Sequence, residues 1–311
     1  MTKRKSEIVL GPVLFNWPNE VLEDFYNRIA DEADVDVVYV GEAVCSKRTP
    51  FRQEVFPRIV ERLEGAGKKV ILSTLALVTT KIERKALAET CADDGFLIEA
   101  NDLTALSHLS GRPHAIGPYV NIYNEATLAY LERQGAQRIC LPPELAVQSV
   151  EILSRAAKAT VEVFAFGRLP LALSARCYHA RVHNLTKDSC RFICEEDADG
   201  MQVDSLNGKA FLSVNGIQTL SHNAVSLLAD APDLVECGVS AFRLSPHSVD
   251  MVKIAELFRS VLDGKSDPDE ATEELAGLCP DLSLSNGFIH GVEGMRQVAA
   301  GLMAEGENLP A

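Results

Sequence analysis

The stretch VDVVYVGEAVCSKRTPFRQEVFPRIVERLEGAGKKVILSTLAL, residues 35–77, contains one complete strand–helix–strand unit. Its apolar runs at 35–42 and 69–77 are nearly continuous rather than alternating, which is typical of parallel strands that are covered on both faces. Residues 53–66 between them have a helix-like pattern. This unit therefore predicts a parallel sheet whose strands are joined by helices.

The same alternation continues along most of the chain. Further strands are expected at 8–15, 95–100, 114–122, 138–142, 161–167 and 241–246, and further helices at 18–32, 80–91, 102–110, 124–134, 144–158 and 249–263. Eight strands with intervening helices predict the α/β class, as a (β/α)8 TIM-barrel-like single domain over residues 1–311. A doubly wound sheet is the alternative. Its nucleotide-binding versions lose support because neither GxGxxG nor GxxxxGK[ST] follows a strand.

Composition limits the possible environments and partners. The 311 residues are 47% apolar, which is enough for a large core, and 30 basic against 44 acidic residues give a net charge of −14. Such a charge repels phosphate backbones, so no nucleic-acid partner is expected. No apolar run approaches the roughly 18 residues of a membrane-spanning helix, and the apolar start is too short for a signal peptide. We therefore expect a cytoplasmic protein without a membrane span.

The regular alternation breaks between the seventh and eighth strands, where residues 170–224 form a long insertion. This segment contains Cys177, Cys190 and Cys194, with twelve and then three residues between them. It also contains a hairpin signal at Asn207–Gly208. Long connections in compact domains are usually functional or disordered, and the cysteines and apolar residues here argue against disorder.

These cysteines predict a metal site. Cys45 follows the second strand as Cys177 follows the seventh, so in a barrel both belong to the carboxyl-terminal rim. Cytoplasmic thiols stay reduced, and grouped cysteines there bind metal more often than they pair. Four thiolates from Cys45, Cys177, Cys190 and Cys194 can hold either an iron–sulfur cluster or a zinc ion.

Spacing and charge favour the cluster over zinc. Structural zinc sites usually contain close CxxC pairs, which this set lacks. A [4Fe–4S]2+ core with four thiolates has a net charge of −2 and needs compensation. Segment 176–194 contains one acidic residue, Asp188, and four basic residues, Arg176, Arg181, Lys187 and Arg191. A mixed Cys/His zinc site with His179 and His183 is the alternative, but we interpret these histidines as polar residues of the loop.

Other polar residues are weaker candidates. The remaining cysteines have a structural interpretation as small buried residues: Cys91, Cys140, Cys237 and Cys279. Five residues after predicted strands are candidates for a rim pocket, or equally for helix caps: Glu42, Glu99, Asn121, Tyr123 and Glu144. A structural interpretation is also preferred for His114 and His222.

Several motifs occur in order along the chain: LGPVLFNWP, EDFY, VYVGEAVCSKR, VILSTLALV, LPLALSARC, NGIQTLS and RLSP. Together they resemble the collagenase-like peptidase U family, from about residue 8 to about residue 250. Beyond that, an NGF motif at 286–288 resembles a C-terminal element of the family. The resemblance is to those members that serve ubiquinone synthesis without oxygen.

This resemblance implies a cofactor, partners and site residues. It implies a [4Fe–4S] cluster with Cys45, Cys177, Cys190 and Cys194 as ligands. It also implies a heterodimer with a sister subunit, a lipid-binding accessory protein, and ubiquinone precursors that are hydroxylated on their ring. The implied function is that of an iron–sulfur subunit in an O2-independent hydroxylase complex.

Two other functions remain open. Relatives in the family include proteases and RNA-hydroxylating proteins, yet the sequence contains no HExxH motif and no recognisable nucleophile pair. The acidic charge also argues against RNA. The other alternative is a noncatalytic scaffold subunit in which a metal only staples the insertion.

Overall fold

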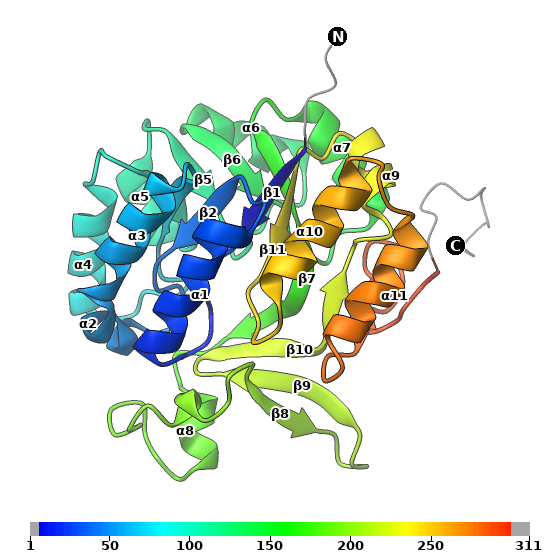
Figure 1. Ribbon diagram of the computed structural model, residues 1–311. Helices are drawn as coiled ribbons and strands as arrows, with labels where there is room; N and C mark the ends of the chain where they lie inside the picture. Colours follow the sequence, from blue (N-terminus) through cyan, green and yellow to red (C-terminus); the bar gives the residue numbers. More distant parts are fainter. Residues whose placement is uncertain (1–5, 300–311) are drawn as a thin grey trace.

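The computed structural model describes residues 6–299. Eight parallel strands close into a barrel, because β11 pairs with both β7 and β1 (Figure 1). The barrel strands are β1 (Glu7–Leu10), β2 (Val37–Val40), β3 (Lys69–Ser73), β4 (Leu97–Ala100), β5 (His114–Ile116), β6 (Ala136–Cys140), β7 (Thr160–Leu173) and β11 (Ala241–Leu244). The predicted (β/α)8 fold is confirmed.

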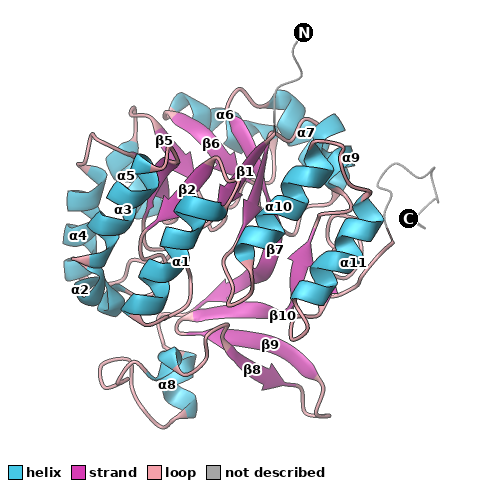
Figure 2. Cartoon of the chain, in the orientation of Figure 1, coloured by secondary structure: helices cyan, strands magenta, loops and turns pink. Residues whose placement is uncertain are grey.

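Helices surround the barrel and cover its outer face (Figure 2). Those at the predicted positions are α1 (Asn19–Glu32), α3 (Val55–Gly65), α4 (Lys81–Cys91), α5 (Leu103–Leu109), α6 (Glu125–Arg133), α7 (Val147–Ala156) and α10 (Met251–Leu262). Four more had not been predicted: α2 (Thr49–Arg52), α8 (Tyr178–Val182), α9 (Ala231–Glu236) and α11 (Pro268–Leu278). Three of the four are shorter than two turns, too short for a periodic signal.

The continuous apolar runs reflect two separate cores. Val9, Val37 and Tyr39 pack together in one buried cluster inside the barrel. Their strand neighbours Ile8 and Val38 belong to the larger core between the barrel and the helices. Because successive side chains point to opposite faces of a strand, both sets are buried. This explains why both faces of the strands carry buried apolar side chains, among which a few buried charged residues also point into the barrel.

Several strands are shorter than expected. The predicted strand 8–15 ends at Leu10, and 114–122 ends at Ile116, before Gly117 and Pro118. The apolar residues beyond these ends still contribute to the core, since Val13 and Phe15 are buried where the chain turns across the end of the barrel. Apolar character alone therefore does not separate a strand from a buried rim loop.

The insertion grows out of the seventh strand. β7 continues past the barrel to Leu173 and pairs there with β10 (Gln218–Ser226) in antiparallel fashion. β9 (Ala210–Asn215) and β8 (Met201–Asp204) extend this sheet into an arm beneath the barrel, next to α8 (Figure 1). The predicted hairpin at Asn207–Gly208 is the β8–β9 turn. The strand predicted over 161–167, however, does not end at residue 167 but continues to Leu173.

The C-terminal segment is attached to the arm. β12 (Leu284–Ser285) pairs with β10, and the buried Asn286 of the NGF motif donates to the Asp230 carboxylate over 3.1 Å. His290 Nε2 lies 3.0 Å from the same carboxylate. Within residues 6–299, no helix is both long enough and apolar enough to cross a membrane.

Candidate metal centre at the barrel rim

Two loops from distant parts of the chain meet below the barrel. Cys45 follows β2 and precedes the short helix η1 (Ser46–Arg48), while Cys177 follows β7 and caps α8. Both pack against one small apolar cluster, which includes Val44 and Ile217. The structure thus brings these two predicted ligands to the same end of the barrel, as the rim argument had predicted.

Cys190 and Cys194 lie in the loop that follows α8, and Cys194 belongs to the short helix η2 (Ile193–Glu195). Between them, Arg191 and Phe192 have φ angles of 51° and 56°. Left-handed backbone costs residues other than glycine about 1–2 kcal/mol each, so surrounding contacts must hold this loop. One such contact is an edge-to-face pair with Phe51 of α2, whose ring centroid lies 4.9 Å from that of Phe192.

A buried cation contacts the cysteine loops. Arg48 is 1% exposed and lies three residues after Cys45. Its Nη2 is 3.5 Å from the Sγ of Cys194, and its Nη1 donates to the carbonyl of Leu14 over 2.8 Å. The Glu42 carboxylate lies 3.6 Å from Nη1. Arg48 therefore places a positive charge beside a thiol from the other loop.

Backbone hydrogen bonds shape both loops. The Glu42 carboxylate accepts from the amides of Val44 and Cys45, each over 2.9 Å, and so fixes the turn that presents Cys45. The amide of Ala180 donates to the Sγ of Cys177 over 3.4 Å. Donors of this kind stabilise a thiolate without adding another side-chain charge.

The pKa of Cys177 is affected by two other thiols of the insertion, which lie within electrostatic reach of it. Burial raises the pKa of Cys177, the Ala180 amide lowers it, and the neighbouring Cys194 and Cys190 raise it further. Burial also raises the pKa of Cys45, against which Arg48 acts. A raised pKa keeps these thiols protonated. A metal that binds them would have to displace the thiol protons, because it is the thiolate form of cysteine that binds metal.

All four predicted ligands are free and partly exposed. In the part of the chain that the structure describes, no three Cys, His, Asp or Glu side chains are close enough to surround a single metal ion. A cubane cluster separates its ligand sulfurs more widely than a single ion does. The chemistry of the four-thiol set with its buried arginine matches such a cluster.

A family model described as peptidase family U32 matches residues 20–298. The chain belongs to peptidase family U32. This match covers β2 to α11, and with them both cysteine loops. It confirms the resemblance to the collagenase-like peptidase U family.

Solved structures show only remote likeness to this U32 member. A thiamine phosphate pyrophosphorylase from Pyrococcus furiosus is 11% identical, with 90% of this chain and 98% of that chain covered and a TM-score of 0.40. A phospho-2-dehydro-3-deoxyheptonate aldolase from Thermotoga maritima is 11% identical (91% and 71% covered, TM-score 0.33). The YdjI aldolase from Escherichia coli K12 is 10% identical (90% and 94% covered, TM-score 0.31).

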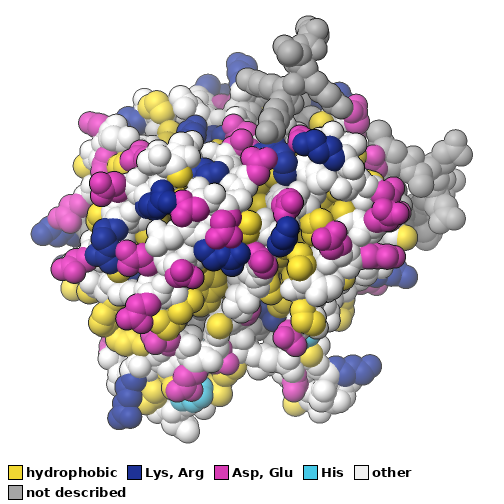
Figure 3. Space-filling model, viewed as in Figure 1, with side chains coloured by type: hydrophobic (Ala, Val, Ile, Leu, Met, Phe, Trp, Pro, Cys, Tyr) yellow, Lys and Arg dark blue, Asp and Glu magenta, His cyan; other side chains and the backbone are white. Residues whose placement is uncertain are grey.

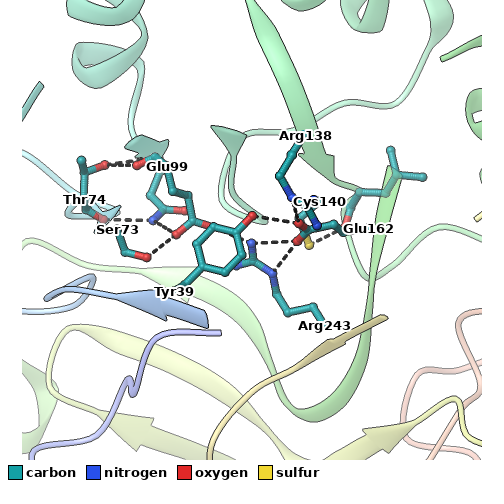
Figure 4. A network of polar contacts seen from close by, with 10 residues as sticks. Tyr39, Ser73, Thr74, Glu99, Arg138, Cys140, Glu162 and Arg243 are labelled. Atoms are coloured by element: carbon teal, nitrogen blue, oxygen red, sulfur yellow. Dashed lines mark hydrogen bonds and ion pairs between the residues drawn. The ribbon is translucent and has the colours of Figure 1, made fainter. Parts of the chain in front are cut away.

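A network of charges fills the interior of the barrel (Figure 4). The carboxylate of Glu162 binds Arg243 over 3.0 Å, Arg138 over 2.8 Å and the Tyr39 hydroxyl over 2.8 Å. Arg243 also pairs with Glu99 over 2.7 Å and stacks on Tyr39. Burial raises the pKa of Glu162, but Arg243 and Arg138 outweigh it and hold the pKa below its ordinary value.

The weaker candidates for a rim pocket lie in different places in the structure. Glu99 lies inside β4, fully buried, rather than in a rim pocket. Glu42 is part of the cysteine site, as described above. Tyr123 and Glu144 are hydrogen-bonded to each other near the surface, and Asn121 is exposed.

The histidines have structural partners. His179 is buried, its Nε2 lies 2.8 Å from the Asp197 carboxylate, and its ring stacks on that of His183. The Nδ1 of His114 lies 2.8 Å from the carbonyl of Arg112. For His222, the backbone carbonyl accepts from Arg168, whereas the buried ring Nδ1 has no hydrogen-bond partner among the described residues. The other four cysteines are buried, as predicted.

A cleft opens beside the cysteine loops. It has a volume of about 350 Å³ and is lined by Asn19 and Glu23 of α1, by Phe51, and by Arg58 of α3. Figure 3 shows hydrophobic side chains at this end of the molecule. In the two cysteine loops, Phe51 is 57% exposed, and Tyr178 beside Cys177 is 44% exposed.

The sequence argument missed Arg48, although it stands in the same motif as Cys45. It had sought compensating cations in segment 176–194, whereas the one that contacts a cysteine sulfur comes from the other loop. It also missed Asn215, whose side chain accepts from Arg48 over 3.1 Å. The dipeptide Asn215–Gly216 is a second turn signal that could have revealed the β9–β10 hairpin.

Proposed function

We propose that this chain is the [4Fe–4S] subunit of a heterodimeric system for O2-independent ring hydroxylation in anaerobic ubiquinone (coenzyme Q) biosynthesis, the counterpart of the UbiV protein. Membership of family U32 and the order of the sequence motifs support this assignment. The observation that carries it is the contact between Arg48, beside Cys45, and the sulfur of Cys194. It joins the two cysteine loops around a buried positive charge.

The surroundings of the thiols suit an anionic cluster. Four thiolates on a [4Fe–4S]2+ core carry a net charge of −2, which is costly to bury without compensation. Arg48 and the amide of Ala180 provide such compensation. When bound, a cluster of this kind supplies one-electron transfer at a potential set by burial, charge and hydrogen bonds.

The protein's own residues have three tasks in this proposal. Cys45, Cys177, Cys190 and Cys194 provide the sulfur ligands. Glu42 holds the loop that presents Cys45. The insertion covers the barrel mouth, where the Nε1 of Trp17 donates to the carbonyl of Ala198 over 2.7 Å and so helps to exclude water.

The partners follow from the same proposal. The sister subunit UbiU would complete the heterodimer, and a lipid-binding accessory protein would present the ubiquinone precursors. Exposed apolar side chains near the cysteine loops, including Phe51 and Tyr178, offer contact area at this end of the molecule. Co-purification of differently tagged subunits under anaerobic conditions tests the heterodimer.

The decisive experiment measures iron and acid-labile sulfide, with a UV–visible spectrum, after anaerobic purification. The samples are the wild type and four single variants, Cys45→Ala, Cys177→Ala, Cys190→Ala and Cys194→Ala. We expect about four iron and four sulfide in the wild type and loss of both in every variant. Cys140→Ala is the matched control, since Cys140 is buried in the barrel. Zinc in the wild type, or an intact cluster in any of the four variants, would contradict the ligand set.

Function requires a second measurement in cells. Cells in which Cys177→Ala is the sole copy should make no ubiquinone without oxygen, whereas Cys140→Ala cells should make normal amounts. Normal anaerobic ubiquinone in the Cys177→Ala cells would rule out the proposed role. A cluster that cannot be reduced or oxidised would instead favour the scaffold function.

A further inference from the structure

A continuous chain of hydrogen bonds leads from the cysteine site into the barrel. Arg48 Nη2 donates to Asn215 Oδ1 over 3.1 Å, and Asn215 Nδ2 donates to Gln218 Oε1 over 3.1 Å. Gln218 Nε2 then donates to the hydroxyl oxygen of Tyr119 over 2.6 Å. At the other end, Arg48 contacts Cys194. Four side chains thus connect Cys194 with the loop that follows β5.

Burial makes this chain rigid. Arg48, Asn215 and Gln218 are each at most 1% exposed, so water does not compete for their hydrogen bonds. Leaving a hydrogen bond of a buried amide unmade is costly, which fixes the orientation of both side chains. If the amide of Gln218 turned over, its NH2 group would face that of Asn215, and the hydrogen bond between the two amides would be lost.

All donors in the chain point in the same direction, from the guanidinium toward the tyrosine. Aligned hydrogen bonds polarise one another, so the positive charge of Arg48 strengthens each following bond. Tyr119 accepts at its oxygen and keeps its own proton for a further acceptor. Burial raises the pKa of Tyr119, with Glu99 nearby acting in the same sense, so the hydroxyl stays protonated.

We propose that Tyr119 is a positioning residue for the cysteine site, which holds Arg48 against Cys194 through Gln218 and Asn215. This proposal rests on the proposed cluster only for its electrochemical test. The Tyr119 hydroxyl also lies within electrostatic reach of Glu99 and Arg243, the charged residues of the barrel interior.

Tyr119→Phe tests the chain, because it removes one oxygen and leaves Gln218 without its acceptor. Once Gln218 is free, Asn215 and Arg48 are held less firmly. A guanidinium that is held less closely beside Cys194 stabilises the reduced, more negative cluster less. We expect full iron content and a reduction equilibrium constant lowered by up to tenfold, which corresponds to 59 mV for a one-electron couple. The readout is a redox titration followed by electron paramagnetic resonance.

Control variants distinguish an effect transmitted through the Arg48–Tyr119 hydrogen-bond chain from a general disturbance of the fold. Tyr123→Phe removes a hydroxyl from the same rim segment, one that donates to Glu144 and has no part in the chain from Arg48 to Tyr119, and it should leave the potential unchanged. Gln218→Met should lower the potential as Tyr119→Phe does, and the double variant should add little, since both changes break one chain. An unchanged potential in both single variants, or fully additive shifts, would overturn the proposal.

The chain can also be tested if the purified protein contains no cluster. The side-chain Nε–H resonance of Arg48 is then followed in arginine-labelled protein and assigned by its loss in Arg48→Lys. Tyr119→Phe should shift this resonance and speed its exchange with water several-fold, while Tyr123→Phe should not. Missing iron would thus refute the proposed function alone, and an unmoved resonance would refute the positioning role alone.

Discussion

The guanidinium of Arg48 lies 3.5 Å from the sulfur of Cys194, although 146 positions separate the two residues in the sequence. Arg48 comes from the loop after β2, and Cys194 from the insertion after β7. Barrel closure brings the two loops to one end of the molecule, because the carboxyl ends of parallel strands share one rim. The cysteine site is therefore a product of the fold as well as of the cysteine spacing.

Replacing Arg48 should damage the site and the fold together. Arg48→Gln leaves the Glu42 carboxylate without its cation, and removing one partner of a buried pair costs about 3–5 kcal/mol. We expect a lower urea midpoint and less bound iron, with partial recovery of both in Arg48→Lys. Arg58→Gln breaks an exposed pair with Glu23 and should leave the urea midpoint nearly unchanged. Equal losses in the Arg58 and Arg48 variants would contradict this ranking.

Glu162 should be essential for the barrel core. Glu162→Gln leaves Arg243 and Arg138 with an uncharged partner, and we expect a loss of about 3–5 kcal/mol in unfolding free energy. The folded-state pKa of Glu162 is lowered, so the carboxylate stabilises the protein fully above its unfolded pKa of about 4.3. That stabilisation fades as the pH falls below this value. In urea titrations from pH 7 to pH 3, the stability difference between the wild type and Glu162→Gln should therefore shrink toward the acid end.

Glu83 connects α4 with the cysteine loop, and its effect should depend on pH. Burial raises its pKa, but hydrogen bonds from Ser46, Thr79 and Thr80 dominate and lower the pKa to about 2. The charged form is thus favoured by folding, and its contribution is complete above about pH 4.3 and lost as the pH falls toward about 2. Glu83→Gln should cost about 1–2 kcal/mol at pH 7, the usual range for a helix cap.

The measurement for Glu83 is thermal unfolding at pH 7, 5 and 3. The difference between the wild type and Glu83→Gln should shrink at pH 3. Glu89→Gln, on the exposed side of the same helix, should match the wild type at every pH. A difference that grows toward acid would mean that Glu83 does not act through its charged form.

The left-handed residue Arg191 should carry measurable strain. Glycine adopts its φ of 51° without penalty, so Arg191→Gly should raise stability by about 1 kcal/mol, whereas Arg191→Ala should not. Differential scanning calorimetry of the two variants gives this comparison. A gain of equal size in both variants would show that charge, not backbone conformation, is responsible.

The sequence alone predicted the barrel well, for a physical reason. Buried parallel strands such as Val37–Val40 are apolar on both faces, and that pattern is recorded locally. The extension of β7 to Leu173 was not predictable in this way. Its outer part pairs with β10, and such pairing depends on a segment more than forty residues further along the chain.

The four-cysteine ligand set stays a prediction from the sequence, and the residues that support these thiols were not predicted. Thiol spacing leads to the metal-ligand hypothesis, whereas the place of Arg48 in the Cys45 motif does not reveal that it contacts Cys194 until the barrel has closed. In the sequence, Asn215 and Gln218 likewise cannot be distinguished from ordinary polar residues of a hairpin. Their role follows from two hydrogen bonds that join different loops.

The position of Cys45 and Cys177 also dictates an order of assembly. Five strands, β3 to β7, must take their places between the two loops before these thiols meet. Contacts of such long range form late, because the intervening chain must be organised first. A nascent chain therefore has no complete set of ligands to offer. Under the proposed function, iron and sulfide would be delivered to a barrel that has already closed, and any scaffold that donates a cluster would have to recognise the finished fold rather than the emerging polypeptide.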